Sequence, residues 1–196
     1  MITLGVTGNL STGKSEVVKI LRKQGAVVFD ADRAAHEAVQ MGKPVYKAIV
    51  KIFGTEYLKK NKQIDRAMLA TRVFSYAVDL RKLNTLIHPG VIFECLKMIE
   101  LNKRKKGFLV MDVPLLFESK MESLAEFTIV VSSTLSNILE RSKRKGYSQS
   151  LAKKILSTQW SLKKKERLAD FVVRNNGTIL ELEKQVLGVL KQIKGK

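Results

Sequence analysis

Residues 8–15 read Gly8-Asn9-Leu10-Ser11-Thr12-Gly13-Lys14-Ser15, which is a complete G-x-x-x-x-G-K-S phosphate loop. Its glycines let the backbone curl so that N–H groups point inward, where they can hold nucleotide phosphates. Lys14 would reach the β- and γ-phosphates, and the hydroxyl of Ser15 would bind Mg²⁺. The stretch therefore predicts a site for a nucleoside triphosphate.

The segments on either side of this loop have the character that the motif requires. Residues 2–6 are short, apolar and β-branched, which indicates a buried strand. Val17, Ile20 and Leu21 recur at helical spacing, so the loop opens a helix whose N-terminus favours anions. The alternative is a glycine-rich turn in which Lys14 is merely solvated, and the strand–loop–helix context disfavours it.

Length and cysteine content narrow the class of protein. The 196 residues, 45% of them hydrophobic, suffice for one globular domain with a sizeable core. The single cysteine, Cys95, lies in an apolar context and is expected to fill the core, as in a reducing compartment. We expect a cytoplasmic protein, because the sequence shows neither a membrane span nor the features of a secretory signal.

The charge is strongly positive, with 36 Lys and Arg against 18 Asp and Glu, a formal net charge of +18. Such a charge is typical of proteins that bind nucleic acid. Here, however, the basic residues are mostly lysines spread along the whole chain, so nucleic acid is not the favoured partner. A multiply phosphorylated small substrate would also suit a positive cleft.

Strand and helix signals alternate along the chain. Further buried strands are expected at four places, 26–29, 108–111, 128–131 and 171–173. This alternation predicts an α/β fold, with a five-stranded, mostly parallel sheet flanked by helices, as in phosphate-loop NTPases and kinases. Ser148 and Thr178 are expected to cap helices, the latter in a capping box with Glu181, and His88-Pro89-Gly90 to break one.

One domain with two helical insertions accounts for the spacing of the predicted strands. The core would comprise residues of three segments, about 1–41, 106–133 and 169–196. Residues 42–105 are too long for a simple crossover, so we expect a helical substrate subdomain there. Residues 134–168 are charged and helical, and we expect them to form a lid.

Three carboxylates follow predicted strands, where ligands bind in open α/β sheets. Asp32 is the candidate to accept the proton of the acceptor hydroxyl, and the alternative is that it caps the helix expected over 33–40. Asp30 is assigned a structural role. Asp112 resembles the acidic residue that helps to hold Mg²⁺ in phosphate-loop enzymes, but a structural role is equally compatible with the sequence.

Phosphoryl transfer also requires cations near the charge that spreads over the transferred group. The expected lid supplies four candidates, Arg141, Arg144, Lys165 and Arg167. The sequence does not decide which of them contacts phosphate.

An ordered set of motifs resembles the dephospho-coenzyme A kinase family over essentially the whole chain. Besides the phosphate loop, the set consists of Asp30-Ala31-Asp32, His88-Pro89, Pro114-Leu115-Leu116-Phe117-Glu118, Gln159, Lys165, Ala169-Asp170 and Asn175-Asn176-Gly177. The resemblance implies ATP-dependent phosphorylation of the ribose 3′-hydroxyl of dephospho-CoA, the last step of coenzyme A synthesis. The alternatives are another phosphate-loop kinase acting on a nucleoside or nucleotide and, less favoured, a basic nucleic-acid-binding NTPase.

The resemblance also implies roles for particular residues. The ATP contacts would come from the loop and the start of its helix, namely Gly8, Ser11, Thr12, Gly13, Lys14, Ser15 and Glu16, with Asn176 near the adenine. Asp32 would be the catalytic base, and Arg144 a catalytic lid contact to phosphate. The substrate side would be lined by His88, Pro114 and Leu115.

Four positions depart from the family's usual pattern. Asn9 stands where a second glycine is usual, and Glu16 where threonine is common. Asn tolerates left-handed backbone angles, so the loop is expected to survive the first change. Lys145 replaces an acidic residue after the lid arginine. Glu140 occupies the usual place of the preceding arginine, which leaves the role of the displaced Arg141 open.

Overall fold

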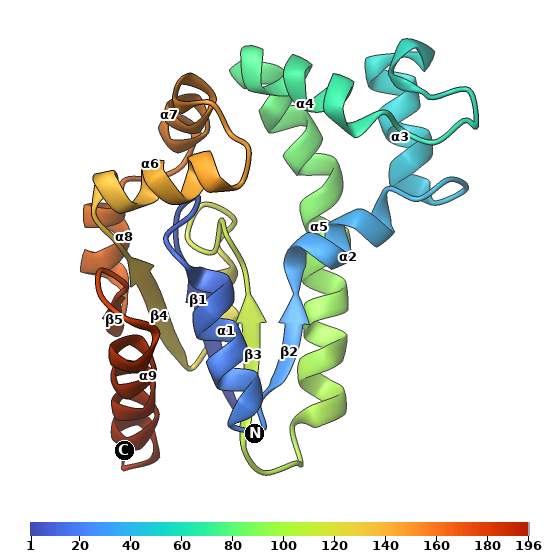
Figure 1. Cartoon of the computed structure of the whole chain (residues 1–196). Helices are drawn as coiled ribbons and strands as arrows, with labels where there is room; N and C mark the ends of the chain where they lie inside the picture. The colour runs from blue at the N-terminus through green and yellow to red at the C-terminus, as the bar shows by residue number, and fades with distance from the viewer. Residues whose placement is uncertain (196) are drawn as a thin grey trace. The chain divides into compact units, whose positions relative to one another are not determined.

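Five strands form a single sheet in the computed structural model, which describes residues 1–195 (Figure 1). The strands are β1 (Ile2–Thr7), β2 (Val27–Asp30), β3 (Phe108–Asp112), β4 (Phe127–Ser132) and β5 (Phe171–Arg174), in the spatial order β2-β3-β1-β4-β5. β1 pairs in parallel with both β3 and β4, and β4 pairs in parallel with β5. The predicted α/β fold is confirmed, and the phosphate loop leaves the central strand.

Helices connect the strands. They are α1 (Lys14–Lys23), α2 (Ala31–Ala38), α3 (Pro44–Phe53), α4 (Arg66–Ser75), α5 (Ala77–Asn102), α6 (Leu135–Arg144), α7 (Gln149–Thr158), α8 (Leu162–Leu168) and α9 (Ile179–Lys194), with short 3₁₀ turns η1 (Thr55–Tyr57) and η2 (Met121–Leu124). Ser148 caps α7 and Thr178 caps α9 in a capping box with Glu181, as predicted. None of the helices in residues 1–195 combines the length and apolarity needed to cross a bilayer.

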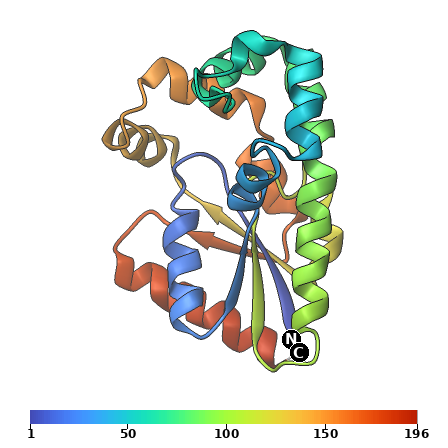
Figure 2. The ribbon, with the colours of Figure 1, turned by 90° about the vertical axis from the view of Figure 1, so that its right-hand side faces the viewer.

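The chain divides into two compact units. The sheet unit comprises Met1–Phe29 and the chain from Met98 onward, and the helical unit comprises Asp30–Lys97. In the sheet unit α1 and α9 lie on one face of the sheet (Figure 2) and bury a core that includes Leu4, Val6, Leu21 and Val186. The helical unit has its own smaller core around Ile49, Phe53, Leu69 and Val73.

Two threonine–carboxylate pairs fix the register of the parallel strands. Glu126, just before β4, accepts bonds from both the N–H and the hydroxyl of Thr3 in β1, at 3.0 and 3.3 Å. Asp170, just before β5, does the same for Thr128 in β4, at 2.8 and 2.7 Å. In both pairs the backbone N–H of the acidic residue donates back to the threonine hydroxyl. In these two strand pairs, side-chain hydrogen bonds therefore add to the backbone hydrogen bonds that hold the strands in register.

Two details of the helices differ from the sequence-based expectations. α2 begins at Ala31, and Asp30, not Asp32, is its cap, accepting a 2.9 Å bond from the N–H of Arg33. The predicted break at His88-Pro89-Gly90 is wrong, because α5 runs through Pro89. Pro89 and Thr85 are both exposed, so the carbonyl that the proline cannot bond, four residues earlier, can be hydrated.

Candidate phosphoryl-transfer site

The phosphate loop occupies the turn between β1 and α1, and its conformation explains two of its residue types. A Cβ atom at Gly8 would lie 2.6 Å from the Thr12 hydroxyl and 2.7 Å from the Val131 carbonyl oxygen. Gly13 has a φ of 96° and caps α1, where a side chain would also collide with the Asn175 amide. Both positions therefore require glycine, one for space and one for backbone conformation as well.

The second half of the loop is held from behind by two side chains that converge on the Thr12 carbonyl. Asn175, at the end of β5, donates its amide N–H to that oxygen at 2.9 Å. Arg141 on α6 donates to the same oxygen at 3.2 Å, and to the Asn175 carbonyl at 2.9 Å. Its guanidinium also bonds the Ser133 hydroxyl at 3.2 Å. Because the N–H of a trans peptide points opposite to its carbonyl, these bonds also fix the direction of the Gly13 N–H.

The first half of the loop is held by the turn between α7 and α8. The side-chain oxygen of Gln159 accepts a 3.1 Å bond from the N–H of Leu10. The Trp160 carbonyl accepts a 3.0 Å bond from the side-chain amide of Asn9. Asn9 is itself 7% exposed, so this contact lies under the loop rather than on the surface.

Opposite charges meet beside the loop. The ammonium of Lys14 forms an ion pair with the carboxylate of Asp112, and both side chains are 14% exposed. The strand register sets this pair, because Val6 pairs with Asp112 and the Val113 N–H bonds the Val6 carbonyl at 3.0 Å. Parallel strands thus bring a carboxylate to the edge from which the loop departs. An ammonium and a carboxylate here can serve a phosphate and its metal ion.

A buried ion pair lies behind the segment that follows Asp112. Lys165 on α8 is fully buried, and its ammonium contacts Glu118 at 2.9 Å and the Pro114 carbonyl at 3.1 Å. Burial lowers the pKa of the Lys165 ammonium, and the Glu118 carboxylate partly opposes that shift. Lys165, one of the four candidate cations from the sequence, is thus a buried partner of Glu118 in this structure.

A family model described as Dephospho-CoA kinase matches residues 2–181 of this sequence. The chain belongs to the dephospho-CoA kinase family. Membership makes it an ATP-dependent kinase of coenzyme A synthesis. Dephospho-CoA kinases from Bacillus cereus and Carboxydothermus hydrogenoformans are each 38% identical, the alignments covering 97% and 98% of this chain and 96% and 95% of the relatives.

Solved structures agree with this assignment. The dephospho-CoA kinase of Campylobacter jejuni superposes with a TM-score of 0.70 at 29% identity, covering 98% of both chains. TT1252 of Thermus thermophilus superposes with a TM-score of 0.82 at 30% identity, covering 97% of this chain and 96% of its own. Shikimate kinase from Acinetobacter baumannii, at 15% identity and a TM-score of 0.54, shares the fold alone.

The remaining residues predicted on the sheet unit have varied surroundings. Ser15 is exposed at the start of α1, and Glu16 pairs with Lys19 at 2.8 Å on the helix surface. The hydroxyl of Ser11, at a φ of 56°, is buried without a hydrogen-bond partner among residues 1–195. Asn176 accepts bonds from the Ser133 hydroxyl at 3.0 Å and the Thr134 N–H at 2.9 Å, which shapes the start of α6.

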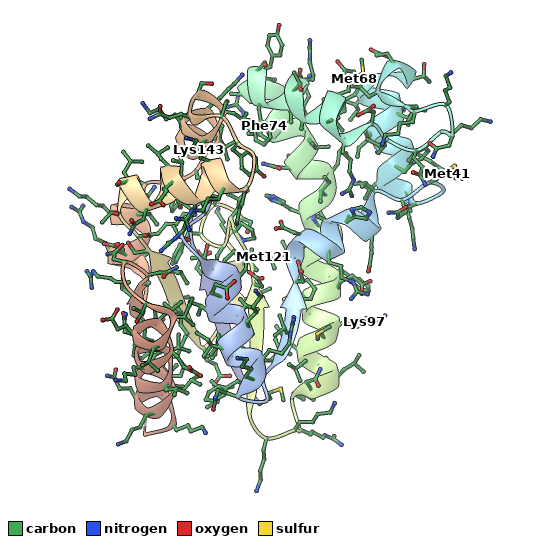
Figure 3. All side chains as sticks on the ribbon, in the orientation of Figure 1. Met41, Met68, Phe74, Lys97, Met121 and Lys143 are labelled. Carbon is green, nitrogen blue, oxygen red and sulfur yellow. The ribbon has the colours of Figure 1, made fainter. Side chains whose placement is uncertain are left out.

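The two arginines of α6 have different surroundings. Arg144, the predicted phosphate contact, is 75% exposed and pairs with Glu140 one turn earlier. Lys143 beside it is also exposed and is labelled in Figure 3. Arg141, whose role the sequence left open, is the one that contacts the phosphate loop.

The other predicted residues lie in the helical unit or in the segment that follows β3. Asp32 is exposed in the first turn of α2, and His88 is half-buried on α5, where burial lowers its pKa. Pro114 and Leu115 are half-buried in the sheet unit after β3. Sequence reasoning did not foresee that Gln159 and Trp160 hold the loop, although Gln159 was part of the family pattern.

Proposed function

We propose that this chain transfers the γ-phosphoryl group of ATP to the ribose 3′-hydroxyl of dephospho-CoA at the phosphate loop. The observation that carries the proposal is the convergence of Lys14 and Asp112 beside a loop braced on both sides. A loop fixed before the nucleotide arrives does not have to reorganise as charge develops, which is the main source of electrostatic catalysis.

The nucleotide side of the reaction is assigned to the loop and its neighbours. Gly8 and residues 11–16 would contact the phosphates of ATP, with Lys14 donating to the β- and γ-phosphate oxygens. Asn176, at the turn after β5, would lie near the adenine. This arrangement is supported by the left-handed conformation of Gly13 at the start of α1 and by the bond that Asn176 accepts from the N–H of Thr134, the cap of α6.

The donor set at the loop fits Mg²⁺, which prefers hard oxygen ligands and retains several waters. The Ser15 hydroxyl and the Asp112 carboxylate are such ligands, and Asp112 would exchange part of its contact with Lys14 for the metal. When bound, Mg²⁺ supplies positive charge to the bridging phosphate oxygens. Lys14 then keeps its own role at the γ-phosphate.

The acceptor side is assigned to the remaining candidate residues. Asp32 would accept the proton of the ribose 3′-hydroxyl as that oxygen attacks the γ-phosphorus, and its side chain is exposed in the first turn of α2, the helix that Asp30 caps. His88, Pro114 and Leu115 would line the substrate side. Arg144 would leave Glu140 and contact the transferring phosphate when residues 134–168 close as a lid. Residues 42–105 would form the substrate subdomain of a cytoplasmic enzyme.

The test is a coupled assay of ADP release with ATP, Mg²⁺ and separate acceptors. The panel consists of dephospho-CoA, nucleosides and nucleoside monophosphates, with GTP replacing ATP in a second series. Turnover confined to dephospho-CoA supports the proposal. Turnover of a nucleoside or nucleotide instead would assign the site to another small-molecule kinase, and hydrolysis stimulated by DNA or RNA with salt-sensitive binding would assign it to a nucleic-acid-dependent NTPase.

A further inference from the structure

We infer that Glu118 is a positioning residue of the phosphate loop, acting through Trp160 and Asn9, and that Lys165 holds its carboxylate in place. The side chains of Glu118, Lys165 and Asn9 do not need to touch a substrate for this role. The inference deepens the proposed function, because it names what fixes the leading edge of the loop that binds ATP.

The first step is the chain of contacts. One oxygen of Glu118 accepts a bond from the Lys165 ammonium at 2.9 Å and another from the Trp160 N–H at 2.9 Å. The carbonyl of Trp160 in turn accepts the Asn9 amide at 3.0 Å. A carboxylate on the segment after β3 is thereby connected to the second residue of the phosphate loop through one tryptophan peptide.

The second step is that Lys165 also fixes the segment that carries Glu118. The Pro114 carbonyl accepts both the Lys165 ammonium at 3.1 Å and the Thr7 hydroxyl at 3.0 Å. Thr7 is the last residue of β1, immediately before the loop, and Pro114 lies two residues after Asp112. Lys165 therefore helps to fix two segments, the residue before the phosphate loop and the chain that leaves β3. β3 ends at Asp112, the carboxylate that pairs with Lys14.

The third step is energetic. A buried ion pair is weak support for stability, because apolar residues of similar volume usually stabilise a fold as well or better. One carboxylate oxygen of Glu118 and the side-chain oxygen of Asn9 are moreover buried without a hydrogen-bond partner within residues 1–195. Buried polar atoms without partners cost free energy, so the stability of the fold does not by itself account for these groups. Their shared property is that they lie on the path to the loop.

The experiment compares two double variants that both remove the ion pair. Glu118→Gln with Lys165→Met keeps an amide oxygen to accept the Trp160 N–H, whereas Glu118→Leu with Lys165→Met keeps none. Neither leaves an unpaired buried charge, so both are expected to unfold cooperatively at similar temperatures. Lys163→Met, at an exposed position of the same helix, is the control for loss of a lysine from α8.

Two readouts separate positioning from simple stability. Steady-state kinetics give kcat and the KM for ATP. Trp160 is the single tryptophan of the chain, so its fluorescence reports directly on the contact between the turn and the loop as ATP is added. The positioning role predicts about a 10²-fold loss of kcat/KM for ATP and no ATP-induced change in Trp160 emission in the Leu variant. The Gln variant should stay within about fivefold of wild type and retain the fluorescence change, because its loop geometry is preserved.

Equal losses in the two variants, or wild-type behaviour in both, would overturn the inference. Should the Leu variant fail to fold, Asn9→Ala breaks the same path at its other end with little loss of packing. It should raise the KM for ATP and abolish the Trp160 response, and wild-type values of both would equally overturn the inference. If the wild type does not phosphorylate dephospho-CoA, the proposed acceptor fails, while ATP titrations followed by Trp160 still test the positioning role.

Discussion

Replacing Arg141 by methionine should weaken ATP binding more than replacing the exposed Lys143, two positions along α6. The guanidinium makes three bonds of 2.9–3.2 Å, to the Thr12 and Asn175 carbonyls and the Ser133 hydroxyl. Both carbonyls keep a second donor when it is removed, so each lost bond should cost about 1 kcal/mol, less than the roughly 1.5–3 kcal/mol of a typical bond to a charged group. The sum is about 2–3 kcal/mol.

If this loss is expressed in the loop conformation that binds nucleotide, the Kd for ATP rises by roughly 30–100-fold, since each 1.4 kcal/mol is tenfold. Isothermal titration with ATP and Mg²⁺ measures it, with thermal unfolding in parallel. Lys143→Met is the control for ATP affinity, as an exposed cation two positions along α6. Arg144→Met, which breaks only a surface pair, controls for unfolding temperature and should shift it little. Wild-type ATP affinity in Arg141→Met would refute the claim that this arginine holds the loop.

Three further outcomes are expected. Asp32→Asn should lower kcat about 10²–10⁴-fold with ATP affinity nearly intact, because it removes a proton acceptor but no phosphate contact; near-normal turnover would exclude the base. Thr128→Val removes the hydroxyl bonds to Asp170 and should lower the free energy of unfolding by about 1–2 kcal/mol, and an unchanged urea midpoint would contradict the register lock. Burial raises the pKa of the Cys95 thiol to about 11, so at pH 8 a disulfide reagent should label it only as the chain unfolds, whereas immediate labelling of the native protein would show the thiol to be accessible.

Local patterns in the sequence were sufficient for the fold and for the phosphate loop. Glycine at position 13 has a local cause, namely its left-handed backbone with a φ of 96°. The capping box at Thr178 likewise depends only on residues within one turn. Such features are readable because the groups that decide them are neighbours in the chain.

The errors and omissions concern groups that are distant in sequence. Lys165 looks like a surface lysine until the chain folds it against Glu118, 47 residues away, so no local pattern marks it as buried. Arg141 contacts Thr12 across 129 residues, and a one-residue displacement on α6 could be judged only against the loop itself. Pro89 was misread for another reason, because whether a proline ends a helix depends on which side of the helix faces water.

The parallel topology has a consequence for how the chain is made. β1 leaves the ribosome well before its ladder partners, which begin at Phe108 and Phe127. At about 5–20 residues per second, translation needs roughly 5–20 s to supply the first partner strand. Throughout that interval the apolar strand β1 has no partner strand. Chaperones shield nascent chains that expose such unpaired segments. A stalled or truncated message ending before residue 108 would thus yield a product whose opening strand has nothing to join, however intact its nucleotide motif.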